Sequence, residues 1–224
     1  MQHTQDHIIW LIEDKKAYAD TLAFILNNTS GLSCTKHFSS IEEFESFIKT
    51  PFYTNSPDLI LLDVELKEGG KSGIEGLPGI KKAMPDIPVL MLTLYENQQT
   101  VLDAFSAGAE GYIVKGTPHD QITKMIKEAI ADQLLASSKI KQHLLKHLHR
   151  PTKPVKNPLT EKQMAVLSLM CDGLGRAQIS LKLGISHATV DNHYRKIYER
   201  LEVHSEVAAV VKAFKEGLVP LHNE

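Results

Sequence analysis

Short apolar runs that alternate with helical patterns constrain the fold of this chain more than any other feature of its sequence. The main runs are HIIWLIED (7–14), DLILLD (58–63), IPVLMLT (87–93) and EGYIVK (110–115). Continuous apolar runs of this kind are typical of strands buried on both faces. Because helical patterns separate them, we expect right-handed crossover connections and a parallel sheet.

A weaker strand pattern, LSCTKHF (32–38), completes the sheet. Five strands and five helices within residues 7–131 predict a flavodoxin-like, doubly wound α/β domain. In this fold, ligands bind beside the carboxyl ends of the strands, where the strand order reverses.

The chain changes character after residue 131. Residues 132–157 are basic and run into the proline-rich RPTKPVKNP (150–158), which predicts a partly extended linker. Residues 158–217 show no strand pattern and predict four short helices, a second and smaller all-α domain. The first part is acidic and the last is almost neutral, although the whole chain carries a net charge of only −2. Such asymmetry favours separate partners for the two domains.

The stretch Gly70-Lys71-Ser72 has the form of the end of a nucleotide-binding P-loop. The full motif needs a glycine at residue 65, where this chain has Glu65, and a carboxylate there would repel phosphate groups. We therefore exclude a nucleotide site and interpret the stretch as a flexible surface turn.

The residues at the ends of the apolar runs carry the chemistry of the predicted sheet. They are Glu13, Asp14, Asp63, Thr93 and Lys115. Carboxylates that share a small site raise one another's pKa, and a divalent cation is the usual remedy. Oxygen ligands without His or Cys favour Mg²⁺. With a hydroxyl and an ammonium group at the same edge, the set predicts phosphoryl transfer to Asp63 as nucleophile.

On these motifs, residues 7–131 resemble the receiver domain of bacterial response regulators. The resemblance implies that Asp63 is the phosphoacceptor, that Asp14 binds Mg²⁺ directly and that Glu13 lies in the outer shell of the metal. It also implies that the backbone carbonyl of Glu65 is a metal ligand. The phosphoryl-binding and switch residues that it implies are Thr93, Lys115 and Tyr112.

The chain departs from the family pattern in the loop after the acceptor. Leu66-Lys67 stands where Met-Pro is usual, and the matching glycine is Gly73, two residues late. Neither change removes a chemical group, so we expect phosphorylation competence to be retained. Tyr95, two residues after Thr93, is bulky, and we expect it to slow hydrolysis of the phosphorylated form.

A helix-turn-helix is predicted by AQISLKL-GIS-HATVDNHYRKIYERL (177–201). We expect Gly184 to make the turn and Ser186 to cap the second helix. The residues expected to pack inward are Ile179, Leu183 and Ile185, followed by Val190, Ile197 and Leu201.

Residues 159–210 resemble the LuxR/NarL (FixJ-type) DNA-binding domain in LT, GLGRAQIS-LKLGIS, TVDNH and IYERL. The DNA-contacting residues that the resemblance implies are Lys182, Thr189, Asp191, Asn192, Arg195 and Lys196. Asp191 departs from the family, which usually has Lys or another neutral or basic residue there. A carboxylate near phosphates costs affinity, although Asp can accept a hydrogen bond from cytosine N4.

These features predict a two-component transcription regulator that is not an enzyme. We expect a sensor histidine kinase to phosphorylate Asp63, and double-stranded promoter DNA to be bound by a homodimer. No apolar run is long enough for a membrane span, and two distant cysteines fit a reducing compartment, so we expect a cytoplasmic protein. The alternative is a phosphorylation-gated protein-interaction adaptor whose helix-turn-helix no longer reads bases. An aspartyl-phosphate phosphatase is disfavoured, because it would need Asp rather than Glu at residue 65.

Overall fold

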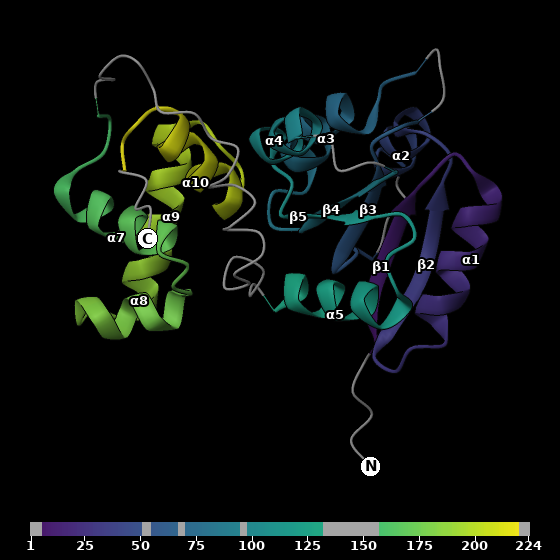
Figure 1. The fold of residues 1–224 in the computed structure, drawn as a ribbon, viewed down its shortest axis with the longest axis horizontal. Helices are drawn as coiled ribbons and strands as arrows, with labels where there is room; N and C mark the ends of the chain where they lie inside the picture. The colour runs from purple at the N-terminus through teal and green to yellow at the C-terminus, as the bar shows by residue number, and fades with distance from the viewer. Residues whose placement is uncertain (1–5, 51–54, 67–69, 95–97, 132–156, 220–224) are drawn as a thin grey trace. The chain divides into compact units, whose positions relative to one another are not determined.

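The computed structural model describes residues 6–50, 55–66, 70–94, 98–131 and 157–219. They form an α/β part and a C-terminal helical part (Figure 1). The predicted linker, apart from Asn157, and Tyr95 lie outside the described residues. The proposed domain boundaries therefore stay predictions.

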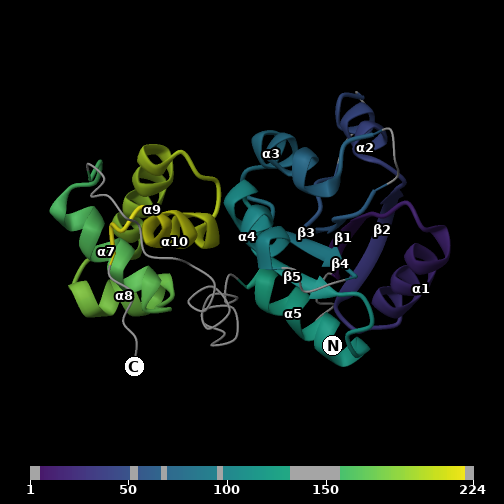
Figure 2. The same cartoon turned by 45° about the horizontal axis from the view of Figure 1, so that its top comes forward.

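Five parallel strands form one sheet in the order β2-β1-β3-β4-β5, which confirms the flavodoxin-like arrangement. The strands are β1 (His7–Ile12), β2 (Leu32–Phe38), β3 (Leu59–Asp63), β4 (Val89–Thr93) and β5 (Gly111–Val114). The helices between and after them are α1 (Lys16–Asn27), α2 (Ile41–Ile48), α3 (Gly73–Ala83), α4 (Gln98–Ala107) and α5 (His119–Ile130). Helices α1 and α5 lie on one side of the sheet, and α2 and α3 lie on the other (Figure 2).

The central strands are buried on both faces, which explains why apolar and polar residues do not alternate along their sequences. Every residue of β3 and of β4 is buried. Trp10 of β1 packs edge-to-face against aromatic rings of β2 and α2, with ring centroids 5.6 Å from Phe38 and Phe47 and 6.2 Å from Phe44. Such pairs add about 0.5–1.5 kcal/mol each beyond the burial of apolar area, so the cluster holds α2 against the β1–β2 edge.

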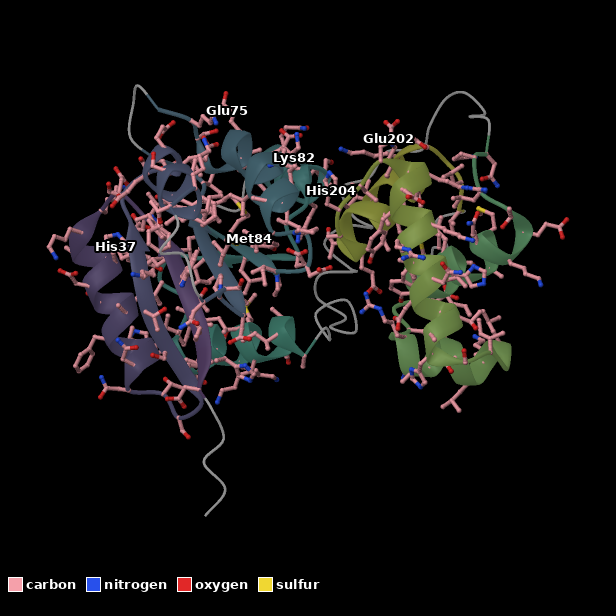
Figure 3. The ribbon with its side chains drawn as sticks, turned by 180° about the vertical axis from the view of Figure 1, so that it is seen from behind. His37, Glu75, Lys82, Met84, Glu202 and His204 are labelled. Atoms are coloured by element: carbon pink, nitrogen blue, oxygen red, sulfur yellow. The ribbon has the colours of Figure 1, made fainter. Side chains whose placement is uncertain are left out.

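The segment before α3 is a surface turn, as predicted, and it also carries a helix cap that the prediction did not include. The Ser72 hydroxyl accepts from the N–H of Glu75, and the carboxylate of Glu75, labelled in Figure 3, accepts from the Ser72 N–H at 2.9 Å. Nζ of Lys71 lies 2.6 Å from Oε1 of Glu45 on α2. The S-x-x-E pattern of a capping box is present in GKSGIEG, and it accounts for the ordered start of the helix.

The helical part contains the predicted helix-turn-helix. Its helices are α7 (Glu161–Cys171), α8 (Arg176–Leu183), α9 (His187–Leu201) and α10 (Glu206–Lys215). Gly184 ends α8 with φ of 63°, and the Ser186 hydroxyl accepts from the N–H of Thr189, which confirms the turn and the cap. Gly is the residue that adopts this left-handed conformation without steric cost.

The inward face of the helix-turn-helix differs from the prediction at Leu183, and Ile185 is only half-buried. Ile179 and the three apolar residues predicted on α9 are buried, but Leu183 is 36% exposed. Ser180 is buried instead, and its hydroxyl donates to the carbonyl of Ile185 at 2.6 Å. The buried set also includes Tyr194. Among the described residues, no helix is both long enough and apolar enough to cross a membrane.

Candidate functional site

Three carboxylates converge at the carboxyl edge of the sheet. Glu13 and Asp14 follow β1, and Asp63 ends β3, which pairs directly with β1. One carboxylate oxygen from each residue lies within 4.8 Å of the other two. Glu13 is 0% exposed and Asp63 is 1% exposed, so two of the three groups are fully removed from water. The structure thus brings together the acidic residues that the sequence placed at the ends of separate strands.

Lys115 supplies the cation at this edge. Its Nζ lies 2.7 Å from Oε2 of Glu13 and 2.9 Å from Oδ2 of Asp63, and its side chain is 5% exposed. Burial alone would lower the pKa of Lys115, but its hydrogen bonds to Glu13 and Asp63 raise the pKa above the ordinary value. The ammonium therefore stays charged and is shared between two buried carboxylates.

The charge at the edge is only partly balanced. Burial raises the pKa of Asp63 to about 6; hydrogen bonding to Lys115 opposes this rise, and the charge of Glu13 adds to it. Oδ1 of Asp14 is buried and has no hydrogen-bond partner in the described part of the chain. Three carboxylates facing one ammonium, with an oxygen-only donor set and an unsatisfied carboxylate oxygen, fit a magnesium ion.

The remaining predicted residues lie around this edge. The N–H of Glu65 donates to Oδ1 of Asp63 at 3.2 Å, while the Glu65 side chain points to solvent. Thr93 is buried at the end of β4, and its carbonyl accepts from the N–H of Lys115 at 2.6 Å. Tyr112 is half-buried on β5, in register with Met91. These positions agree with the predicted roles, which stay predictions.

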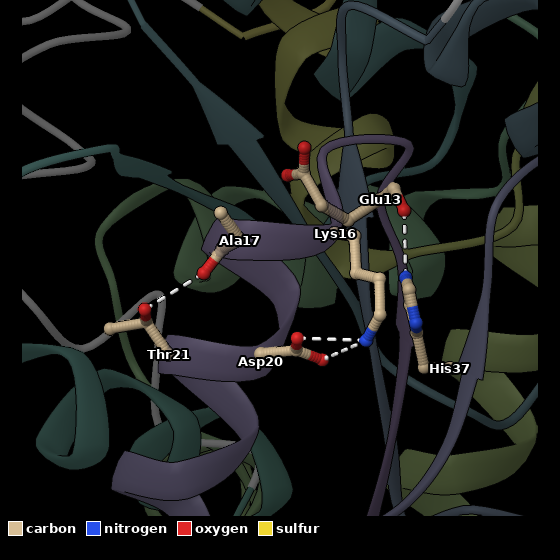
Figure 4. Close-up of polar contacts among 6 residues, drawn as sticks. All are labelled: Glu13, Lys16, Ala17, Asp20, Thr21 and His37. Carbon is tan, nitrogen blue, oxygen red and sulfur yellow. Dashed lines mark hydrogen bonds and ion pairs between the residues drawn. The ribbon is translucent and has the colours of Figure 1, made fainter.

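Two residues of the site were missed by sequence reasoning. The ring of Tyr18, on α1, lies under Nζ of Lys115 at 4.8 Å from the ring centroid. Nε2 of His37, on β2, lies 2.7 Å from the backbone carbonyl of Glu13 (Figure 4). Neither position carried a signal, because an aromatic in a first helical turn and a histidine in a partly exposed strand are both ordinary.

Gly73 packs closely against the end of β3, next to Asp63. Its N–H donates to the carbonyl of Val64 at 3.1 Å, and a Cβ at this position would clash with the carbonyl oxygen of Asp63. The α3 N-terminus therefore packs backbone-to-backbone on Asp63. This contact requires a residue without a side chain at position 73, whereas the match of Gly73 to the family glycine stays a prediction.

The predicted DNA-contacting residues lie away from the buried stripe of α9. Lys182, Asp191, Arg195 and Lys196 are exposed. The hydroxyl groups of Thr189 and Ser186 form a hydrogen bond with each other, with their oxygens 2.8 Å apart. Nη2 of Arg195 donates to Oδ1 of Asn192 at 3.0 Å. The placement is compatible with DNA contact, but the contacts themselves stay predictions.

Asp63→Asn is expected to stabilise the metal-free protein at high pH. The folded-state pKa of Asp63 is about 6, above its ordinary 3.8. The contribution of Asp63 to the free energy of unfolding is therefore fully present below pH 3.8 and is lost as the pH rises through 6. Relative to wild type, the variant should gain about 2 kcal/mol in the free energy of unfolding between pH 4 and pH 8. Urea titrations in EDTA measure this gain, and a difference that does not depend on pH would contradict it.

Comparisons with known proteins agree with the fold of the α/β part, which is that of a receiver domain. Residues 9–127 match the response regulator receiver domain family, and residues 157–213 match the bacterial regulatory proteins of the luxR family. The chain therefore belongs to the response regulators with a LuxR-type helix-turn-helix, and it is a DNA-binding transcriptional regulator of the two-component type. The protein-interaction adaptor is not favoured.

Individual relatives extend the same comparison. The chain is 36% identical to a nitrate/nitrite response regulator protein homolog of Haemophilus influenzae over 162 residues, 72% of this chain and 76% of that protein. It is 32% identical to the response regulator protein VraR of Staphylococcus aureus over 165 residues, 73% and 77% of the two chains. A putative response regulator from Chloroflexus aurantiacus aligns with a TM-score of 0.50 and 25% identity, covering 57% of this chain and 99% of that one.

Proposed function

We propose that Asp63 accepts a phosphoryl group from a sensor histidine kinase and that this modification controls DNA binding by the helical part. The observation that carries the proposal is the buried Asp63 carboxylate 2.9 Å from the ammonium of Lys115, at the carboxyl edge of the sheet. An Asp63 oxygen attacks phosphorus, the phosphorus–nitrogen bond to the kinase histidine breaks, and an acyl phosphate forms.

The surrounding residues then act on the transferred group. Lys115 neutralises charge on its oxygens, and the Thr93 hydroxyl donates a hydrogen bond to one of them. Asp14, Asp63 and the Glu65 carbonyl would hold Mg²⁺, with Glu13 in its outer shell, and the ion would offset the charge of the phosphoryl oxygens. Since Lys115 pairs with both Glu13 and Asp63, phosphorylation changes the partners of its ammonium. Thr93 and Tyr112 transmit this change as the switch residues.

The output is binding of double-stranded promoter DNA by a cytoplasmic homodimer. A single helix-turn-helix unit has few surplus positive charges and binds the phosphates of DNA weakly. Two units on one site bind more tightly, because the first contact raises the effective concentration of the second unit. Lys182, Thr189, Asn192, Arg195 and Lys196 supply contacts to phosphates and bases, and Asp191 lies among them.

Labelling by acetyl phosphate in Mg²⁺ tests the acceptor. Wild type should incorporate one phosphoryl group per chain, and Asp63→Asn should lose the label entirely, because an amide cannot form the acyl phosphate. Asp20→Asn is the matched control: it removes an exposed aspartate of α1, whose partner is Lys16, and should be labelled like wild type. Label that persists in Asp63→Asn would show that another residue is the nucleophile.

Phosphorylation should also raise affinity for DNA. A mobility-shift assay at low salt with selected promoter duplexes measures this effect, with sedimentation of the phosphorylated and unphosphorylated chain as the test of dimer formation. Equal DNA binding by both forms would contradict the proposed control.

A further inference from the structure

The unusual acidic residue of α9 is held by an arginine of the preceding helix. Oδ1 of Asp191 lies 3.3 Å from Nε of Arg176, which is the first residue of α8. The guanidinium of Arg176 lies 4.4 Å above the ring centroid of Tyr194. Tyr194 is 2% exposed, and its hydroxyl donates to Oε1 of Glu206 at 3.3 Å. The arginine thus rests on a buried ring and fixes the carboxylate from one side.

Asp191 nevertheless stays available to a ligand. Its side chain is 61% exposed, and it lies near the N-terminus of the second helix of the helix-turn-helix. Residues at that end of the second helix face base edges when such a unit enters the major groove. We propose that Asp191 determines sequence specificity by selecting a cytosine in each half-site, with Arg176 as its positioning residue. This inference rests on the proposed DNA-binding function.

The chemistry of the major groove selects the base. A carboxylate only accepts hydrogen bonds. Guanine presents two acceptors, thymine presents an acceptor and a methyl group, and adenine presents its amino donor beside the N7 acceptor. Cytosine presents the N4 amino donor with no acceptor beside it, so it is the base that a carboxylate fits.

The ion pair makes an acidic residue tolerable at a DNA surface. An unpaired carboxylate near phosphates opposes binding to every sequence, whereas the positive charge of Arg176 offsets part of that repulsion. The repulsion that remains between Asp191 and the phosphates weakens binding to non-specific DNA. At a site with the cytosine, the hydrogen bond from N4 offsets this repulsion. The expected result is a lower affinity overall and a sharper choice at one base pair.

The test uses the full-length chain treated with acetyl phosphate. Selection from random duplexes identifies the preferred site, and affinities are then measured on that duplex and on variants with each cytosine replaced. Wild type should lose about 5- to 100-fold at one C·G pair. Asp191→Asn should lose that discrimination while binding random duplex more tightly.

Matched variants separate base reading from charge. Glu199→Gln removes another exposed carboxylate of α9, so it should tighten binding to random duplex but keep the cytosine preference. Arg176→Lys keeps the charge and loses the planar stack on Tyr194, so its preference should be weaker than that of wild type but present. Thermal unfolding of each variant verifies the fold.

The outcomes distinguish failure of the cytosine inference from failure of the proposed DNA-binding function. If wild type binds DNA and Asp191→Asn keeps the same base preference, or wild type shows no preferred cytosine, the inference is overturned. If neither wild type nor any variant binds a duplex, the proposed DNA-binding function fails as well.

Discussion

Lys115→Met is expected to cost roughly 3–5 kcal/mol in the free energy of unfolding at pH 8 in EDTA, because it leaves buried carboxylates without their cation. Glu13 and Asp63 are 0% and 1% exposed, and the ammonium of Lys115 contacts both. Methionine fills similar volume but carries no charge. The loss should shrink at about pH 5, where protonation of Asp63 removes one of the unpaired charges.

Urea unfolding followed by tryptophan fluorescence measures this loss in the full-length chain. Trp10 is the chain's one tryptophan, and it is 2% exposed in the core between the sheet and α2. Lys124→Met is the control, since its side chain is 75% exposed and should change stability by less than about 0.5 kcal/mol. Adding Glu13→Gln to Lys115→Met should restore part of the loss. Equal stability of the two lysine variants would show that the buried ion pair contributes little.

Gly73→Ala is expected to destabilise the α/β part by about 3 kcal/mol or more, or to displace the acceptor loop. The added Cβ would meet the carbonyl group of Asp63, with its carbonyl carbon 2.9 Å away, and backbone atoms cannot rotate aside as a side chain can. Displacement would move the acceptor carboxylate from Lys115. Acetyl phosphate labelling should therefore fall even where the variant still folds.

Gly79→Ala provides the control within the same helix. Its Cβ would meet only Oε1 of Glu45 at 3.5 Å, an ordinary contact, so the substitution should stabilise the helix by about 0.5–1 kcal/mol. Labelling should be unchanged. If both alanine variants behaved alike, the contact between Gly73 and the acceptor residue would not limit the loop.

The sheet and the centre of the site were predictable because strand ends converge by rule. A buried strand excludes polar side chains until it ends, so Glu13, Asp63 and Lys115 each mark the end of an apolar run. Parallel strands then place these ends at one edge whatever the chain between them does. The contacts among these side chains were not predictable. Whether two carboxylates share one ammonium depends on the side-chain rotamers and on how deeply each group is buried.

Other features escaped because their signals are local or depend on partners far along the chain. The capping box of Ser72 and Glu75 is a four-residue pattern within Gly70-Lys71-Ser72 and the start of α3, where it coincides with the end of a P-loop motif. Ser180 replaced Leu183 in the core because its hydroxyl satisfies the carbonyl of Ile185 across the turn. Apolar periodicity alone does not register such a bond. The pairing of Asp191 with Arg176 links residues from two helices, and charge counting along the chain could not reveal it.

Contacts at the start of α3 hold Asp63 in place. Gly73 is bound to Val64 on one side of the loop, while Lys71 and Ser72 are held by Glu45 and Glu75 on the other. Residues inserted between these anchors need not move Asp63. Asp63 is thus positioned by contacts made at the described ends of the loop, so its place beside Lys115 depends on these contacts and not on the surface that the loop presents.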